Sequence, residues 1–141
     1  MTDRLTTFDD LTVGQKACLE KTVTQADLDH FIAITGDTNP LHVDPDFAGR
    51  TFFGQCIAHG MLSASLFSTL VGMHIPGTGA IYKSQTLAFI RPVFINDTLT
   101  AWFEITNIDR AGETITLNSW IENQAGLTVI KGTATTGLIR S

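Results

Sequence analysis

Two residues that can move protons, Asp37 and His42, stand five positions apart in the segment 35–42, which reads Thr-Gly-Asp-Thr-Asn-Pro-Leu-His. Carboxylate and imidazole groups are the usual tools of general acid–base catalysis. The Gly, Asn and Pro residues favour a turn of fixed shape, so the two side chains can converge on one site. The segment therefore predicts a site of proton transfer. The alternative is that Asp37 only caps the turn and His42 is an ordinary surface histidine.

A second candidate for chemistry is Gly60, which opens the uncharged segment 60–72. Large apolar residues recur in this segment at helical spacing, and a helix without a charged face is typically buried. The first backbone N–H groups of a helix have no partner within it, so they can stabilise a developing oxyanion. We expect the neighbouring His59 to have a structural role, as a cap of this helix.

A metal site is a third possibility, because His42, Asp44 and Asp46 alternate along the chain. Pro45 follows Asp44 directly, and this order is typical of an N-cap residue followed by the first residue of a helix. No further cluster of ligand-type residues accompanies them. The sequence therefore favours a short helix after Asp44 and no metal.

The elements that must hold these residues change in type along the chain. Residues 15–23 predict a strand, and Thr24 with Asp27 predicts a capping box for a helix that ends at Gly36. After the helix at 60–72 come segments rich in Ile, Thr, Val, Phe and Trp, at residues 80–89, 97–108, 114–123 and 127–138. Short turns between these segments predict successive antiparallel strands. The expected class is α+β, in one domain.

The composition narrows the class of protein. The chain has 141 residues, of which 43% are hydrophobic and 16% charged, as in one globular domain. A net charge of −5 argues against a nucleic-acid partner, because no basic stripe is present to contact phosphates. No apolar segment is long enough to span a membrane, and residues 1–7 lack the apolar core of a signal peptide. We therefore expect a cytoplasmic protein in which Cys18 and Cys56 are free thiols.

The proton-transfer segment and its surroundings resemble a known family. The pattern Phe31-x-x-Ile34-Thr35-Gly36-Asp37-x-Asn39-Pro40-Leu41-His42 looks like the hydratase motif of the MaoC-like, (R)-specific enoyl-CoA hydratases. The likeness extends into the segments 58–62, 81–85 and 91–98. This resemblance implies a single hot-dog domain over residues 1–141, with a long buried central helix wrapped by a five-stranded antiparallel sheet.

The resemblance also implies an activity. Such a protein is a hydro-lyase of fatty acid metabolism that reversibly hydrates trans-2-enoyl-CoA to (3R)-hydroxyacyl-CoA without a cofactor. Asp37 and His42 would activate the water, and the backbone N–H of Gly60 would stabilise the enolate. Asn39 would orient the turn or the water, and Ser68 would line the acyl pocket. A homodimer whose substrate tunnel is lined by both protomers is implied as well.

Three alternatives remain open at this point. The acyl group could be carried by acyl carrier protein, with the reaction running toward dehydration. An acyl-CoA thioesterase is possible because hot-dog proteins include thioesterases, although segment 37–42 resembles the hydratases. A non-catalytic acyl-binding module would be expected to lack Asp37 or His42. The candidates for contact with CoA phosphates are Arg50, Lys83 and Arg91, and the sequence does not choose among them.

Overall fold

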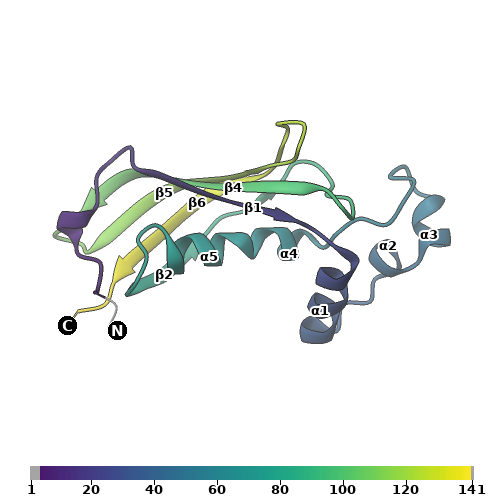
Figure 1. Cartoon of the computed structure of the whole chain (residues 1–141), viewed down its shortest axis with the longest axis horizontal. Helices are drawn as coiled ribbons and strands as arrows, with labels where there is room; N and C mark the ends of the chain where they lie inside the picture. Colours follow the sequence, from purple (N-terminus) through teal and green to yellow (C-terminus); the bar gives the residue numbers. More distant parts are fainter. Residues whose placement is uncertain (1–3, 141) are drawn as a thin grey trace.

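An antiparallel sheet of six strands is the central element of the protein in a computed structural model that describes residues 4–140. Residues 1–3, which belong to the segment in which we expect no signal peptide, lie outside that range, as does Ser141. The strand order is β1-β4-β5-β6-β2, and β3 also pairs with β6 (Figure 1). The strands are β1 Lys16–Thr22, β2 Ala80–Gln85, β3 Ala88–Phe89, β4 Thr98–Asp109, β5 Thr114–Glu122 and β6 Thr128–Leu138.

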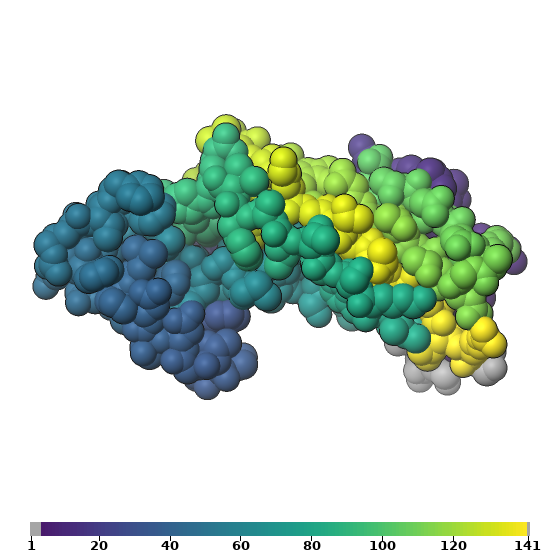
Figure 2. Space-filling view, turned by 180° about the vertical axis from the view of Figure 1, so that it is seen from behind, coloured from purple at the N-terminus to yellow at the C-terminus, as the bar shows by residue number. Residues whose placement is uncertain are grey.

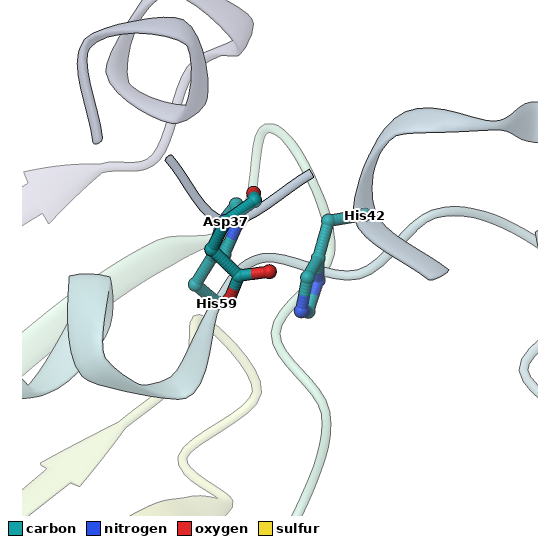
Figure 3. Close-up of side chains that lie close together, drawn as sticks. All are labelled: Asp37, His42 and His59. Carbon is teal, nitrogen blue, oxygen red and sulfur yellow. Dashed lines mark hydrogen bonds between the residues drawn. The ribbon is translucent and has the colours of Figure 1, made fainter. Parts of the chain in front are cut away.

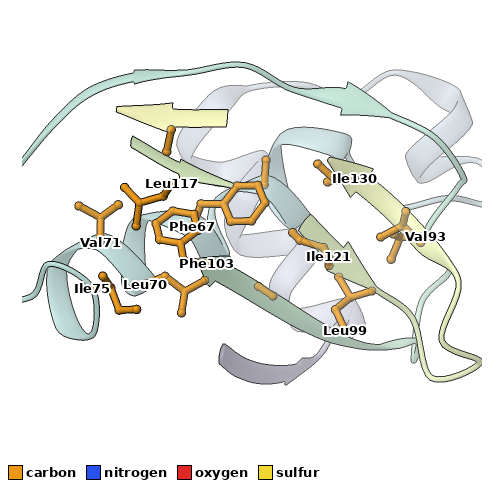
Figure 4. Close-up of a cluster of buried hydrophobic side chains, with 14 of the residues drawn as sticks. Phe67, Leu70, Val71, Ile75, Val93, Leu99, Phe103, Leu117, Ile121 and Ile130 are labelled. Atoms are coloured by element: carbon orange, nitrogen blue, oxygen red, sulfur yellow. The ribbon is translucent and has the colours of Figure 1, made fainter. Parts of the chain in front are cut away.

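The two central strands bury one face and leave the other more accessible. Buried and part-buried residues alternate along β4 and β5, as the two-residue period of a strand requires. Leu99, Phe103 and Ile105 of β4 point to the same face as Leu117 and Ile121 of β5, and all are fully buried. Figure 4 labels four of these side chains, Leu99, Phe103, Leu117 and Ile121, in the cluster between the sheet and one helix. This face is the main hydrophobic core.

The expected long helix packs on this face, and it has one irregular residue, Ser65, between two regular parts. It consists of α4, Gly60–Ala64, and α5, Leu66–Met73. At Ser65 the hydroxyl donates to the carbonyl of Leu62 at 2.5 Å, while the Ser65 N–H is shared between the carbonyls of Met61 and Leu62. A serine hydroxyl that bonds back to the preceding turn competes with the regular helical pattern.

The expected burial of this helix is seen on the side that faces the sheet. Phe67, Leu70 and Val71 are buried against the sheet, and the Phe67 ring stacks 5.4 Å from that of Phe103. The opposite face is exposed and carries no charge; it comprises Met61, Ser65, Ser68, Thr69, Gly72 and Met73. Because a single sheet can cover only one side of a helix, the other side is left open (Figure 1).

The strand predicted at 80–89 is divided, which accounts for six strands where five were expected. Between β2 and β3 the carbonyl of Thr86 lies over Gly132 of β6, only 1.8 Å from where a Cβ on that glycine would lie. This close approach of two backbones breaks the regular pairing and requires glycine at position 132. The chain then runs from β3 to β4, which is not its neighbour in the sheet, so Asn96-Asp97 ends a crossover and not a hairpin.

Three short helices lie beyond one end of the sheet, opposite the chain termini (Figure 1). They are α1, Gln25–Thr35, α2, Pro40–Val43, and α3, Pro45–Gly49; a 3-10 helix, η1, spans Phe8–Asp10. The predicted capping box of α1 is confirmed, and Gly36 ends α1 in the left-handed conformation with φ 74°. The Asp44 side chain caps α3, also as predicted. None of the helices within residues 4–140 is long and apolar enough to cross a membrane.

Candidate functional site

Asp37 and His42 are brought together by the end of α1 and the start of α2. Asp37 directly follows the Gly36 cap, and its carboxylate accepts the backbone N–H of Asn39 at 3.1 Å, which fixes the turn. His42 lies one turn into α2 and is half-buried. The carboxylate of Asp37 points toward the imidazole of His42 (Figure 3). The convergence predicted from the turn residues is therefore observed.

The hydrogen bond of His42 determines which of its nitrogens can take part in chemistry. Nδ1 lies 2.7 Å from the carbonyl oxygen of Ile57. A carbonyl can only accept, so Nδ1 carries the proton in the neutral ring and Nε2 presents a lone pair. His42 is thus oriented as a base at Nε2.

His59 completes the group, although the sequence predicted only a cap for it. The residue precedes α4, but its side chain makes no capping bond. Its ring is 3% exposed and stacks on His42 with ring centroids 3.9 Å apart. Its Nε2 lies 3.1 Å from the backbone oxygen of Asp37. A histidine directly before an uncharged helix was the only sequence signal, and it does not disclose contacts with residues far earlier in the chain.

The three side chains together resemble a ligand set, because one possible ligand atom from each lies within 4.8 Å of the others. His42 and His59 each use one ring nitrogen on a backbone carbonyl, which leaves one nitrogen of each ring available. Asp44, a ligand candidate in the sequence, is used as a helix cap. The arrangement suits acid–base chemistry, and the expectation of no metal stays a prediction.

Asp37, His42 and His59 together are called the acid–base group below. Gly60 is the first residue of α4 and lies beside this group. Within residues 4–140 its backbone N–H has no hydrogen-bond acceptor. A Cβ at this position would come within 2.6 Å of Cε1 of Phe89, which lies in β3. The sequence suggested a role for the backbone N–H at this position, and packing against Phe89 is a separate reason for glycine that it did not disclose.

A cavity of about 760 Å³ extends from the acid–base group along the open face of the helix. It lies between α1, the α4–α5 helix and β2, and Figure 2 shows the surface hollowed where the blue lobe containing α1 meets the body of the molecule. Asp37, His42, Gly60 and Ser68 all line it. Asn39 does not; its side chain accepts the N–H of Leu41 at 3.0 Å and caps α2.

A second cavity, of about 540 Å³, meets the first at the same residues. Both cavities are lined by His42, Gly60 and Met61. The second continues between Phe52, Phe89 and Arg91. Gly60 and His42 therefore lie where the two cavities join.

A polar group lies farther along the first cavity. The hydroxyl of Tyr82 donates to Oε1 of Gln85, and Nε2 of Gln85 donates to the hydroxyl of the fully buried Ser119 at 2.8 Å. Burial raises the pKa of Tyr82 to about 12. The hydroxyl therefore stays protonated and remains a donor at neutral pH.

The pKa of Tyr82 can be measured directly, because the chain contains a single tyrosine. We expect absorbance near 295 nm to titrate with a midpoint of about 12 in the folded protein. After unfolding in denaturant the midpoint should fall to the ordinary value of about 10. A midpoint near the ordinary value in the folded protein would mean that Tyr82 is not sheltered.

Comparison with known proteins places this geometry in a family. Residues 11–125 match the sequence pattern of the MaoC like domain. An (R)-specific enoyl-CoA hydratase of Aeromonas caviae is 46% identical over 124 residues, covering 88% of this chain and 92% of that protein. A protein of the same description from Rhodospirillum rubrum is 43% identical, covering 91% of this chain and 88% of that protein. An (R)-hydratase structure from Pseudomonas aeruginosa superposes with a TM-score of 0.90 at 36% identity, covering 97% of this chain and 88% of that one.

The residues that match the family pattern, 11–125, include both the turn that holds Asp37 and His42 and the helix that begins at Gly60. The solved (R)-hydratase shares the arrangement of one helix along one face of an antiparallel sheet, which is the hot-dog fold. The chain belongs to the MaoC-like family of hot-dog proteins.

Proposed function

We propose that this protein is an (R)-specific enoyl-CoA hydratase, which reversibly adds water to a trans-2-enoyl thioester and forms the (3R)-hydroxyacyl thioester. One observation carries the proposal. The Asp37 carboxylate and the free Nε2 of His42 converge beside the unpartnered N–H of Gly60, at the junction of two cavities. The curated relatives described as enoyl-CoA hydratases support it.

The acid–base pair suits the activation of one water molecule. Among the described residues no direct hydrogen bond joins the Asp37 carboxylate to the His42 ring, although the two lie within a few ångströms of each other. Both groups accept hydrogen bonds, so a water between them would donate one proton to each and keep an oxygen lone pair free. That lone pair is the nucleophile for the β-carbon of the enoyl group.

The proton balance of the reaction closes without any other reactant. As the water oxygen bonds to the β-carbon, one water proton passes to Asp37, and the carbon–carbon π electrons move toward the thioester oxygen. The Gly60 N–H stabilises the resulting enolate. The same pair then returns the proton to the α-carbon, on the face from which the oxygen was added. In this scheme Asn39 positions the turn through its cap on α2, and Ser68 lines the acyl cavity.

The two cavities suit the two arms of an acyl-CoA. With the thioester carbonyl at Gly60, the acyl chain occupies the cavity lined by Ser68 and Tyr82. The carrier arm then follows the second cavity, past Phe52 to Arg91. Arg91 is the basic candidate that lines this path, whereas Lys83 lines neither cavity and bonds to the Glu113 carbonyl. Arg91 is therefore our candidate for contact with CoA phosphates.

Replacement of Arg91 by glutamine should raise KM for crotonyl-CoA about three- to fivefold with little change in kcat, since an exposed ion contact contributes up to about 1 kcal/mol. The matched control is Lys83→Gln, which should leave both constants unchanged. Crotonyl-N-acetylcysteamine lacks the phosphates, so Arg91→Gln should not affect its hydration. An unaltered KM for crotonyl-CoA would exclude Arg91 from the carrier site.

The uncharged face of the α4–α5 helix supports a homodimer. This face is exposed in the single chain, and Met61, Met73 and Phe89 are among the exposed large apolar residues near it. Exposed apolar patches of this kind mark contact surfaces, and two-fold dimers are the commonest assembly. We propose that a second copy of the chain covers this face of the helix.

We expect light scattering to give twice the mass of one chain. Thr69→Arg places a charge on the open helix face, lines neither cavity, and should shift the mass toward the monomer. Thr12→Arg, on an exposed loop, is the control that should remain dimeric. A monomeric mass in an active wild-type preparation would contradict the proposal.

The activity itself is tested with crotonyl-CoA. Loss of the enoyl absorbance without release of free thiol, and a product oxidised only by a (3R)-specific dehydrogenase, are expected. Release of thiol would indicate a thioesterase, and a (3S) product would contradict the assignment. A higher kcat/KM with crotonyl-acyl carrier protein than with crotonyl-CoA would indicate the carrier-protein dehydratase.

A further inference from the structure

His59 is a buried imidazole that contacts both members of the acid–base pair. Its ring is 3% exposed, and its Nε2 lies 3.1 Å from the backbone oxygen of Asp37. The carbonyl can only accept, so Nε2 carries the proton. Its other nitrogen, Nδ1, is buried and has no partner among the described residues. In the neutral ring, these contacts fix the tautomer of His59 with its proton on Nε2.

The ring faces of His59 are occupied as well. One neighbour is the His42 ring, stacked with centroids 3.9 Å apart and planes inclined by 29°. Another is the Phe31 ring of α1, tilted by 47° at a centroid distance of 4.9 Å. His42 is thus held at its edge by the carbonyl of Ile57 and at its face by His59. The orientation of the catalytic imidazole depends on both contacts.

An unpaired buried nitrogen is unfavourable, and native proteins rarely keep one without a compensating role. A phenyl ring would fill almost the same space and remove the unpaired Nδ1, but the carbonyl oxygen of Asp37 would lose its donor. What phenylalanine cannot supply is the N–H donor to Asp37. A requirement of the site for that donor would explain why the protein keeps a histidine here despite its unpaired Nδ1.

We propose that His59 is a positioning residue, which holds Asp37 and His42 at the separation that fits one water molecule. This inference rests on the hydratase activity proposed above. The Nε2–H bond fixes the backbone at Asp37, and the ring fixes the plane of His42. Misplacement of reacting groups by about 1 Å can lower the rate about 10²-fold. Loss of the His59–Asp37 hydrogen bond should therefore reduce kcat. Substrate binding should change little, since His59 lines the acyl cavity but is only 3% exposed, and the proposed contact with the thioester is made by Gly60.

Two substitutions separate the donor from the ring. His59→Phe keeps a flat ring of similar size and removes the N–H. His59→Gln removes the ring and retains an amide N–H at nearly the position of Nε2. We expect His59→Phe to lower kcat for crotonyl-CoA at least tenfold with KM within about twofold and an unchanged melting temperature. His59→Gln should recover most of the lost kcat. His30→Gln, on the exposed face of α1, is the matched control and should behave as wild type.

A second measurement does not depend on activity. In spectra of protein with ¹⁵N-labelled imidazoles, His59 should show the Nε2–H tautomer and His42 the Nδ1–H tautomer, with assignments from the single variants. A wild-type protein that shows both tautomers but has no hydratase activity would contradict the proposed function, while the hydrogen bond from His59 to Asp37 would still be supported.

Several results would overturn the positioning role. One is a His59→Phe variant with kcat within twofold of wild type. Another is a loss of kcat that is equal in His59→Phe and His59→Gln, because the N–H donor would then not be the cause. A fall in the melting temperature of His59→Phe that accounts for its lost activity would mean that His59 serves only packing. An Nδ1–H tautomer of His59 would exclude the hydrogen bond to Asp37.

Discussion

Asp37→Asn is expected to lower kcat for enoyl-CoA hydration by about 10²–10⁴-fold, the usual contribution of one general acid–base group. Asparagine keeps an oxygen that can accept the N–H of Asn39, the bond that Asp37 makes at 3.1 Å, so the turn should persist. What is lost is the negative charge and the capacity to take a proton from the water. KM should change much less, because Asp37 has no proposed contact with the thioester.

His42→Ala should lower kcat by a factor in the same range, for a related reason. It removes the lone pair at Nε2 and also the 2.7 Å bond to Ile57. Asp29→Asn and His30→Ala are matched controls, since both residues are exposed on α1 close to the site in sequence. Both controls should retain wild-type kcat and melting temperature.

The double variant Asp37→Asn/His42→Ala tests whether the two groups share one water. When two residues act as a unit, removal of either one already abolishes their joint effect. The double variant should therefore have a kcat only a little lower than that of the slower single variant. Fully additive losses would instead mean that Asp37 and His42 act in separate steps. Near-wild-type hydration by Asp37→Asn would exclude that residue as the base.

The parts of this site that sequence could predict are those with local causes. The Thr24–Asp27 capping box, the left-handed Gly36 and the Asp44 cap each depend on contacts within three or four residues. These signals set the ends of α1 and α3 and so placed Asp37 and His42 on one turn. The alternation in β4 and β5 likewise predicted the strands, because a buried face requires it.

The parts that could not be predicted depend on contacts between distant segments. His59 meets Asp37 across 22 positions, and Gln85 meets Ser119 across 34, so neither contact leaves a local pattern. The division of the strand at 80–89 depends on Gly132 of another strand. The absence of charge predicted a buried helix, but it did not disclose that one face of the helix lies beyond the reach of the sheet in the single chain.

Gly60→Ala is expected to lower kcat by about 10²–10³-fold, as the loss of one oxyanion donor does in other enzymes. The backbone N–H remains, but a methyl group beside it would keep the thioester oxygen at a distance. The φ angle of Gly60 lies outside the left-handed region, so alanine is compatible with the backbone here and the fold should be retained. Binding of a saturated acyl-CoA should weaken less than kcat falls, because the strongest contact is made with the enolate.

A second effect of the same substitution must be separated from the first. The added Cβ would lie 2.6 Å from Cε1 of Phe89, closer than such atoms approach, so this ring must shift. Phe89 is 53% exposed and belongs to a strand of two residues, so it has room to move. The shift could alter the second cavity, which Phe89 lines, without any involvement of an oxyanion.

The double variant Gly60→Ala/Phe89→Ala distinguishes the two effects. Removal of the Phe89 ring abolishes the clash but leaves the new methyl group beside the N–H. If Gly60 serves the enolate, the double variant should remain as slow as Gly60→Ala, while Phe89→Ala alone should retain kcat within a few fold of wild type. Recovery of kcat in the double variant would show that glycine is required only for packing against Phe89. The N–H of Gly60 would then have no part in stabilising the enolate, and another donor beside the junction of the two cavities would have to supply that charge stabilisation.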